Sequence, residues 1–259
     1  MDRRQLTIWL CVGGFCLGSP GVVSAEESFS SSQKSQIERL IEEYLISHPE
    51  VILESVQNYR ERQETERIEQ GASNLKARKV DLERDPETPF VGNPDGDITL
   101  VEFFDYNCGY CKTVLTTIRQ LLAEDLGVRL VLKEFPILSE GSEYAAKAAL
   151  AARVQGRYFE FHNSLMEIPG QISEKVVLEV AVQVGLDVVK LKKDMEAESI
   201  ISQLESNREL ARSLNINGTP TFVVGDQIIP GAVDAEALRG LIREIRIKGK
   251  FPVFQGPYF

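Results

Sequence analysis

The chain has 259 residues, of which 43% are hydrophobic and 26% are charged, so it can bury the core of one large domain and carry additional segments. Its formal net charge of −10 at pH 7 argues against nucleic acid and against an anionic membrane surface as partners.

Residues 1–25 have the pattern of a secretory signal peptide. A positively charged start precedes an apolar run from Leu6 to Gly18, and small residues lead up to Ala25. The run is shorter than the about 20 apolar residues that a membrane-spanning helix needs. We therefore expect export to the periplasm with cleavage after Ala25, and a membrane anchor is the alternative.

Residues 26–84 are predicted to be a helical oligomerisation segment and linker. Residues 47–50 interrupt the segment, so two helices are expected. Their apolar positions are Ile37, Leu40, Ile41, Tyr44 and Leu45 in the first and Ile52, Val56 and Tyr59 in the second. From Arg60 onward the sequence is polar on nearly all sides, as in a solvated helix or a linker. An apolar stripe needs a partner, so we expect a homo-oligomer through residues 33–60, with docking on the main domain as the alternative.

The stretch 84–97 is rich in Pro and Gly and predicts the start of the main domain, residues 85–259. The β-branched and aromatic run 98–104 predicts a buried strand, residues 111–127 a helix and residues 128–136 a second strand. Strand, helix and strand in this order form a βαβ unit, in which the two strands lie parallel.

A purely helical block is predicted for about residues 138–216. Two short strands, 221–224 and 227–231, follow it and are joined by Gly225-Asp226, a hairpin signal. A helix over 234–247 closes the fold, and the tail after it has no clear assignment. The order of elements predicts an α/β fold, a small mixed sheet with a helical insertion.

Cys108 and Cys111 stand two residues apart at the start of the first predicted helix of the main domain. Removal of the signal peptide would also remove Cys11 and Cys16, so Cys108 and Cys111 would be the two remaining cysteines of the exported chain. Cys108 would meet the free N–H groups and the positive dipole end of the helix, which favour its thiolate and make it the attacking sulfur. Cys111 lies one turn deeper and can close a disulfide, so the spacing predicts a reversible redox couple.

A zinc site and a static structural disulfide are the alternatives for this pair. Structural zinc needs four ligands, and the exported chain would add only His48 and His162, which are far apart in the sequence. His162 is expected to be packed in an aromatic helix face, and His48 is expected at a surface turn. We therefore expect no metal and no cofactor. A static disulfide is left open, because secretion would oxidise the pair in any case.

The motif EFFDYNCGYCK at 102–112, with NGTPTFVVG at 217–225, resembles the thioredoxin superfamily. The helical residues between Pro136 and Asn217 resemble the DsbA branch, in which a helical domain interrupts the thioredoxin fold. The resemblance covers about residues 90–248. It implies a thioredoxin fold with a helical insertion, preceded here by an N-terminal helical oligomerisation segment.

The resemblance implies roles for four further residues. Pro220 would be the cis-proline that lies against the disulfide, and Thr219 would offer its backbone to an extended substrate. Glu102 would be the buried acid below the active site, with Lys133 on the next strand as its partner, and both would move a proton to or from Cys111. The alternative is that Glu102 and Lys133 form an ion pair at the edge or surface of the sheet. Burying a titratable group in a core strand costs free energy, which favours the functional role.

Two departures from the strongly oxidising member of that branch matter. Gly109 and Tyr110 replace its Pro-His pair, so no imidazolium stabilises the thiolate and we expect a less oxidising couple. Gly-Tyr, together with Thr219 before the proline, resembles the DsbC-type isomerases, which are oligomeric. The N-terminal helices resemble the association segment of oligomeric DsbA-like proteins of the copper-sensitivity suppressor and Com1-like types.

These features predict a periplasmic thiol–disulfide interchange protein that isomerises, reduces or forms disulfides in exported polypeptides, with isomerisation or reduction favoured. A net dithiol oxidase of DsbA type is the alternative enzyme. A chaperone or copper-binding protein that uses the same thiols without turnover is the alternative from another class, and a surface structural protein is the third. An inner-membrane redox partner is expected to reset the couple.

Overall fold

The computed structural model describes residues 29–250, and the predicted signal peptide and the C-terminal tail lie outside them. Contacts divide the chain into two compact units, Met1–Arg60 and Glu61–Phe259. Within residues 29–250, no helix has both the length and the hydropathy that crossing a membrane requires.

The first unit contains α1 (Ser31–Ser47) and the first turns of α2 (Pro49–Ala77). Ser30 and Gln33 form a capping box: the Ser30 hydroxyl accepts the Gln33 N–H, and the Gln33 side chain accepts the Ser30 N–H at 2.9 Å. His48 ends α1, which confirms the predicted break. Most of the predicted apolar stripe is exposed on the single chain, namely Ile37, Leu40, Ile41, Tyr44, Ile52, Val56 and Tyr59.

The second unit contains a five-stranded sheet in the order β1-β3-β2-β4-β5. The strands are β1 (Phe90–Gly92), β2 (Ile98–Phe104), β3 (Val128–Glu134), β4 (Thr221–Val224) and β5 (Gln227–Pro230). α4 (Gly109–Glu124) joins the parallel strands β2 and β3, which confirms the predicted βαβ unit. The sequence does not predict β1, because it has only three residues and lies in the stretch of Pro and Gly.

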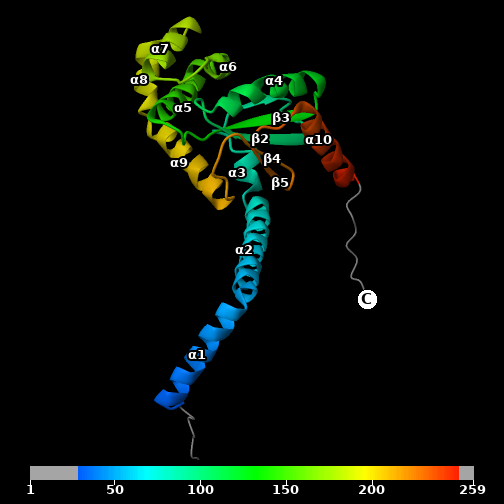
Figure 1. Ribbon diagram of the computed structural model, residues 1–259. Helices are drawn as coiled ribbons and strands as arrows, with labels where there is room; N and C mark the ends of the chain where they lie inside the picture. The colour runs from blue at the N-terminus through cyan, green and yellow to red at the C-terminus, as the bar shows by residue number, and fades with distance from the viewer. Residues whose placement is uncertain (1–28, 251–259) are drawn as a thin grey trace, which may run out of the picture. The chain divides into compact units, whose positions relative to one another are not determined.

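A helical insertion separates β3 from β4, and the fold class is confirmed. Its helices are α5 (Glu140–Ala152), η1 (Arg153–Gln155), α6 (Tyr158–Glu167), α7 (Glu174–Gln183), α8 (Val188–Met195) and α9 (Glu198–Ser213). Helix α10 (Ala235–Lys250) follows the β4–β5 hairpin. Figure 1 shows α5–α8 gathered at one side of the sheet, away from α10.

The sheet has two covered faces, and alternation along each strand decides which face a side chain meets. Leu100 and Phe104 of β2 belong to a core that includes α4, the insertion and α10. Val101 and Phe103 belong to a second core, built with Leu82 of α3 (Lys79–Glu83), the last turns of α2 and the end of α9. A functional side chain on β2 or β3 therefore serves one face only.

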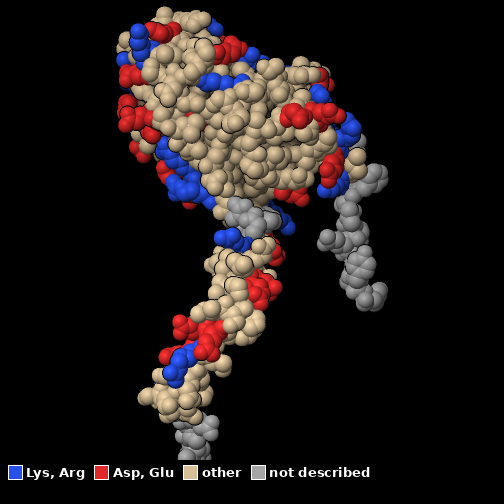
Figure 2. Space-filling model, viewed as in Figure 1, with Lys and Arg blue, Asp and Glu red and all other residues tan. Residues whose placement is uncertain are grey.

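Charged side chains of both signs are mixed around the second unit. Figure 2 shows Lys, Arg, Asp and Glu mainly around the rim of a broad area of other residues on the face in view. Arg246 of α10 pairs with Asp97 at 2.7 Å and with Asp125 at 2.6 Å, before β2 and after α4. These pairs fasten α10 to the loops at the end of the sheet.

Candidate active site

Cys108 is the N-cap of α4, so its side chain faces the unpaired N–H groups of the first helical turn. Its sulfur accepts a hydrogen bond from the Cys111 N–H at 3.4 Å, and its own N–H donates to the Asp105 carbonyl at 3.1 Å. Both cysteines are free thiols, and Cys108 is 6% exposed whereas Cys111 is 1% exposed. The sulfur at the helix tip is therefore the more accessible of the two.

The segment around Pro220 lies directly against Cys108. The Thr219–Pro220 peptide bond is cis, and β4 starts at the next residue. The Cys108 thiol lies 3.1 Å from the Thr219 carbonyl oxygen, to which it can donate. The Thr221 hydroxyl donates to the Gly218 carbonyl at 2.7 Å and closes the turn. The fold thus places Thr219 and Pro220 beside the helix tip that carries the first sulfur.

The two thiols have opposite acidities. A hydrogen bond from the Cys111 side chain lowers the pKa of Cys108 to about 6 against the effect of burial, and the Thr219 side chain and the N–H groups of Cys111 and Tyr110 add to it. Burial, the hydrogen bond to Cys108 and the charge of Glu102 raise the pKa of Cys111 far above its usual value. At neutral pH Cys108 is therefore the thiolate and Cys111 carries the proton.

Glu102 is a buried acid on the same face of the sheet as α4. Its side chain is 3% exposed. Burial raises the pKa of Glu102 to about 8, and the Cys108 charge raises it as well. It lines a cavity of about 100 Å³ together with Leu115 and Arg119 of α4 and His162 of α6. The carboxyl group is therefore mostly protonated at neutral pH, with a minor carboxylate fraction, and it borders a small space beneath α4.

Lys133 lies on the opposite face of the sheet, so the expected pair between Glu102 and Lys133 is wrong. In the parallel register Lys133 stands opposite Phe103, whereas Glu102 stands opposite Leu132. Partners in a register share a face, and a shift of one residue moves a side chain to the other face. The two strands therefore send these side chains into different cores.

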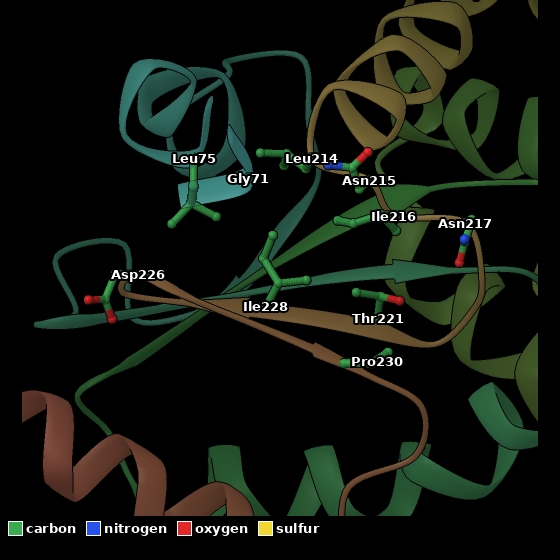
Figure 3. Close-up of a pocket in the computed structure, with 10 residues that line it drawn as sticks. All are labelled: Gly71, Leu75, Leu214, Asn215, Ile216, Asn217, Thr221, Asp226, Ile228 and Pro230. Atoms are coloured by element: carbon green, nitrogen blue, oxygen red, sulfur yellow. The ribbon is translucent and has the colours of Figure 1, made fainter. Parts of the chain in front are cut away.

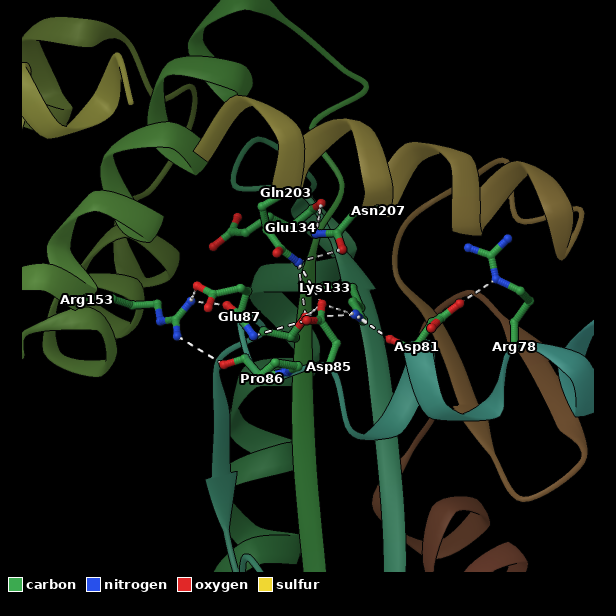
Figure 4. Close-up of polar contacts among 11 residues, drawn as sticks. Arg78, Asp81, Asp85, Pro86, Glu87, Lys133, Glu134, Arg153, Gln203 and Asn207 are labelled. Atoms are coloured by element: carbon green, nitrogen blue, oxygen red, sulfur yellow. Dashed lines mark hydrogen bonds and ion pairs between the residues drawn. The ribbon is translucent and has the colours of Figure 1, made fainter. Parts of the chain in front are cut away.

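The Lys133 ammonium instead joins a buried polar cluster between β3, α9 and the segment around α3 (Figure 4). It donates to the Asp81 carbonyl at 2.8 Å, to the Asp85 carboxylate at 3.2 Å and to the Thr88 hydroxyl at 2.7 Å. Gln203 of α9 donates to the same carboxylate at 3.0 Å. Burial opposes ionisation of Asp85, but hydrogen bonds from Thr88 and Gln203, with Lys133, lower its pKa to about 2. The cluster fastens the start of the domain to the insertion.

Sequence reasoning missed Glu134, the buried acid that does share a face with Glu102. Its Oε1 accepts hydrogen bonds from the Tyr106 hydroxyl at 2.9 Å and the Tyr158 hydroxyl at 2.7 Å. The Tyr106 hydroxyl lies 3.1 Å from Nδ1 of His162, which is packed among aromatic rings as predicted. Burial raises the pKa of Glu134 and lowers that of His162 to about 3, so both are neutral. Glu134 directly follows Lys133 in β3, and neighbouring side chains of a strand point to opposite faces of the sheet. This alternation was the signal in the sequence that could have found Glu134.

A pocket of about 440 Å³ lies on the other face of the sheet, lined by α2, the segment after α9 and the β4–β5 hairpin (Figure 3). Leu75, Ile216 and Ile228 form part of its apolar lining, and Asn217 and Thr221 border the turn before β4. Neither cysteine lines this pocket, so it is separate from the Cys108 site.

Residues 29–250 offer no group of three or more His, Cys, Asp or Glu side chains that could hold a metal ion. Cys108 and Cys111 are free thiols close to each other, and paired thiolates are a ligand type that Cu(I) prefers.

Comparison with family models gives two matches. Residues 99–243 match a model described as "DSBA-like thioredoxin domain", and residues 33–66 match one described as "Copper resistance protein ScsC N-terminal domain". The first match runs from β2 into α10, and the second covers most of α1 and part of α2.

Solved structures and curated proteins give consistent matches. A thioredoxin-like oxidoreductase from Silicibacter pomeroyi is 46% identical, with a TM-score of 0.64 over 65% of this chain and 97% of that one. A linker-deletion mutant of Proteus mirabilis ScsC is 26% identical, with a TM-score of 0.67 over 85% and 98%. Disulfide bond formation protein D of Bacillus subtilis is 28% identical over 62% of this chain and 78% of its own length. The chain spans about a quarter of the length of the Na(+)/H(+) antiporters that it also matches, at 27% identity for one from Salinispora tropica.

Proposed function

The chain belongs to the DSBA-like thioredoxin domain family, and on that premise we propose that it is a periplasmic thiol–disulfide oxidoreductase acting on exported polypeptides. Cys108 and Cys111 form its redox couple. Isomerisation or reduction of substrate disulfides is favoured over net oxidation, because Gly109 and Tyr110 add no positive charge beside the thiolate.

One observation carries the proposal: the Cys108 sulfur sits at the tip of α4 with an acidic thiol, while Cys111 lies behind it with a proton. The Cys108 thiolate attacks one sulfur of a substrate disulfide, forms a mixed disulfide and releases the other substrate sulfur as a thiolate. In isomerisation a substrate thiolate then displaces Cys108. In reduction Cys111 attacks Cys108, so the protein is oxidised to the Cys108–Cys111 disulfide and the substrate leaves with two thiols.

Glu102 supports the second step. Cys111 must lose its proton before it can attack, and burial makes that loss costly. A carboxyl group with a pKa of about 8 is mostly protonated at neutral pH but keeps a minor carboxylate fraction, which can accept the Cys111 proton and later return it. The cavity that Glu102 lines would let water relay the proton between Glu102 and solvent.

Thr219 and Pro220 are proposed to hold the substrate. The Thr219 carbonyl is 3.1 Å from the attacking sulfur, so a polypeptide chain bound along this backbone would bring its own sulfur to Cys108. Backbone hydrogen bonds of this kind accept many sequences, which suits a protein that acts on different exported chains.

The N-terminal helices are proposed to associate through residues 33–60. The exposed apolar side chains of α1 and α2 and the match of residues 33–66 to the ScsC N-terminal model support self-association. The division into a signal peptide at 1–25, a helical segment at 26–84 and a thioredoxin-like domain at 85–259 is part of the same proposal, as is an inner-membrane redox partner that resets the couple.

A scrambled-ribonuclease refolding assay tests the proposal. The full-length protein should restore ribonuclease activity catalytically and Cys108→Ser should not. A variant without residues 33–60 keeps the second unit, which starts at Glu61, so it should keep thiol exchange but lose isomerisation. If the full-length protein shows no turnover while it binds Cu(I) tightly through two sulfurs, the copper-binding alternative replaces the enzyme.

A further inference from the structure

The two residues that flank the cysteine pair hold the same loop of the helical insertion. Asn107 precedes Cys108 and Lys112 follows Cys111, and both side chains reach residues 168–172, which connect α6 to α7. The loop thus has two attachments at the active-site turn, one on each side of the CGYC segment.

Asn107 makes the first attachment. Its Oδ1 accepts the Ile172 N–H at 2.5 Å, and its Nδ2 lies 3.3 Å from the Ile172 carbonyl oxygen. Nδ2 also lies 2.9 Å from the Ser139 hydroxyl and 3.1 Å from the Ser142 hydroxyl, at the start of α5. A single carboxamide therefore joins the residue before the attacking sulfur to two parts of the insertion.

Lys112 makes the second attachment. Its ammonium donates to the Ile168 carbonyl at 2.8 Å and to the Gly170 carbonyl at 2.7 Å. Both acceptors are neutral, so they orient the ammonium without cancelling its charge. Burial lowers the pKa of Lys112, while the charge of Asp105 and, to a smaller extent, that of Cys108 raise it, so the ammonium interacts with both groups.

Gly141 shows how closely the loop is pressed against α5. A Cβ added at Gly141 would lie 2.2 Å from the Ile172 carbonyl oxygen, so a larger residue there must push the loop away. Ile172 is 3% exposed, and Gly170 has a φ of +76°, a conformation that favours glycine. Packing at Ile172 and the hydrogen bonds of Asn107 and Lys112 therefore hold the loop against α5 and the active-site turn.

We propose that loop 168–172 is a clamp on the active-site turn, and that Asn107 and Lys112 are positioning residues that hold the N-terminal turn of α4 around the Cys108 sulfur. The helical insertion thereby influences the thiol–disulfide equilibrium of Cys108 and Cys111. The clamp keeps the N–H groups of the helix directed at the Cys108 sulfur and keeps the Lys112 ammonium near it. This inference rests on the proposed function of the cysteine pair and assigns a role to two residues outside it.

The test is a titration of thiolate absorbance at 240 nm, with the equilibrium against glutathione measured on the same samples. In Lys112→Met the midpoint for Cys108 should rise by about 0.5 unit or more, and the equilibrium should move about threefold or more toward the disulfide form. Lys112→Arg, which keeps the charge, should recover part of the shift. Asn107→Ala and Gly141→Ala change no charge and should shift both readouts in the same direction.

Lys175→Met is the matched control, because Lys175 lies on α7 with an 85% exposed side chain and pairs with Glu179. It should leave the midpoint unchanged. The clamp is overturned if Asn107→Ala or Gly141→Ala, folded by circular dichroism, keeps the wild-type midpoint, because Lys112 would then act by charge alone. It is also overturned if Lys175→Met shifts the midpoint as far as Lys112→Met. A wild-type midpoint near that of free cysteine would instead refute the proposed function itself.

Discussion

The Cys108 sulfur lies 3.1 Å from the Thr219 carbonyl oxygen, although the two residues are 111 positions apart in the chain. The sheet creates this contact, because β2 leads into the turn that carries Cys108 and pairs with β4, which starts just after Pro220. The chemistry therefore depends on the whole fold, and a pair of cysteines two residues apart would not by itself provide a substrate-binding backbone beside the nucleophile.

Replacement of Glu102 by Gln should slow the resolving step. Without a carboxyl group to take the Cys111 proton, attack of Cys111 on a mixed disulfide at Cys108 should slow by about tenfold to a hundredfold at pH 7. Quenched-flow measurement of glutathione release from a preformed mixed disulfide reports this rate. Glu134→Gln is the control, because that buried acid is held by Tyr106 and Tyr158. Equal slowing in both variants would remove Glu102 from the mechanism.

Glu102 should also make stability depend on pH. Its pKa is about 8 in the folded protein and near 4.5 in the unfolded chain, so between these values the folded state binds more protons. The stabilisation is fully present below pH 4.5 and is lost as the pH rises through 8. Between pH 5 and pH 8 the free energy of unfolding should fall less in Glu102→Gln than in the wild-type protein, and the difference between the two falls should be on the order of 4 kcal/mol. If urea denaturation gives the same dependence of the free energy of unfolding on pH for the two proteins, Glu102 does not have the raised pKa of a buried acid.

The Lys133 cluster should contribute to stability without affecting thiol chemistry. Asp85→Asn leaves a buried ammonium without its anion and should lower the free energy of unfolding by about 2 kcal/mol, as measured by urea denaturation at pH 7. Because the pKa of Asp85 is lowered, this contribution is present above pH 3.8 and disappears as the pH falls toward 2. Asp81→Asn, which keeps the carbonyl that Lys133 uses, is the control. A change in the Cys108 thiol pKa in Asp85→Asn would show that the two faces communicate.

The exposed stripe of α1 should hold the oligomer together. Leu40→Asp combined with Ile41→Asp places charges on the apolar face, so multi-angle light scattering should report a monomer. Glu42→Gln, also on α1, should leave the mass unchanged. The double variant should keep the acidic Cys108 thiol and lose isomerisation of scrambled ribonuclease. An unchanged oligomeric mass would place the association surface elsewhere.

The sequence was sufficient for most of the helices and strands of the main domain, although not for β1, and for part of the site. The run at 98–104 is β2 residue for residue, because a buried strand bounded by turns has a clear composition. The expected pair between Glu102 and Lys133 failed, because it depends on the register between β2 and β3, which neither strand shows alone. The clamp at 168–172 could not be predicted either, because Lys112 binds main-chain carbonyls, and a sequence does not reveal which carbonyls tertiary packing leaves available.

The central claim is that Cys108 is an activated nucleophile. The most direct test is the pH dependence of its alkylation by iodoacetamide, with the modified residue located by mass spectrometry. The account predicts modification of Cys108 alone with a midpoint near pH 6, and a higher midpoint in Cys111→Ala, which lacks the side-chain hydrogen bond to the Cys108 sulfur. A wild-type midpoint of about 8.5, the value of free cysteine, or equal modification of Cys111 would contradict it.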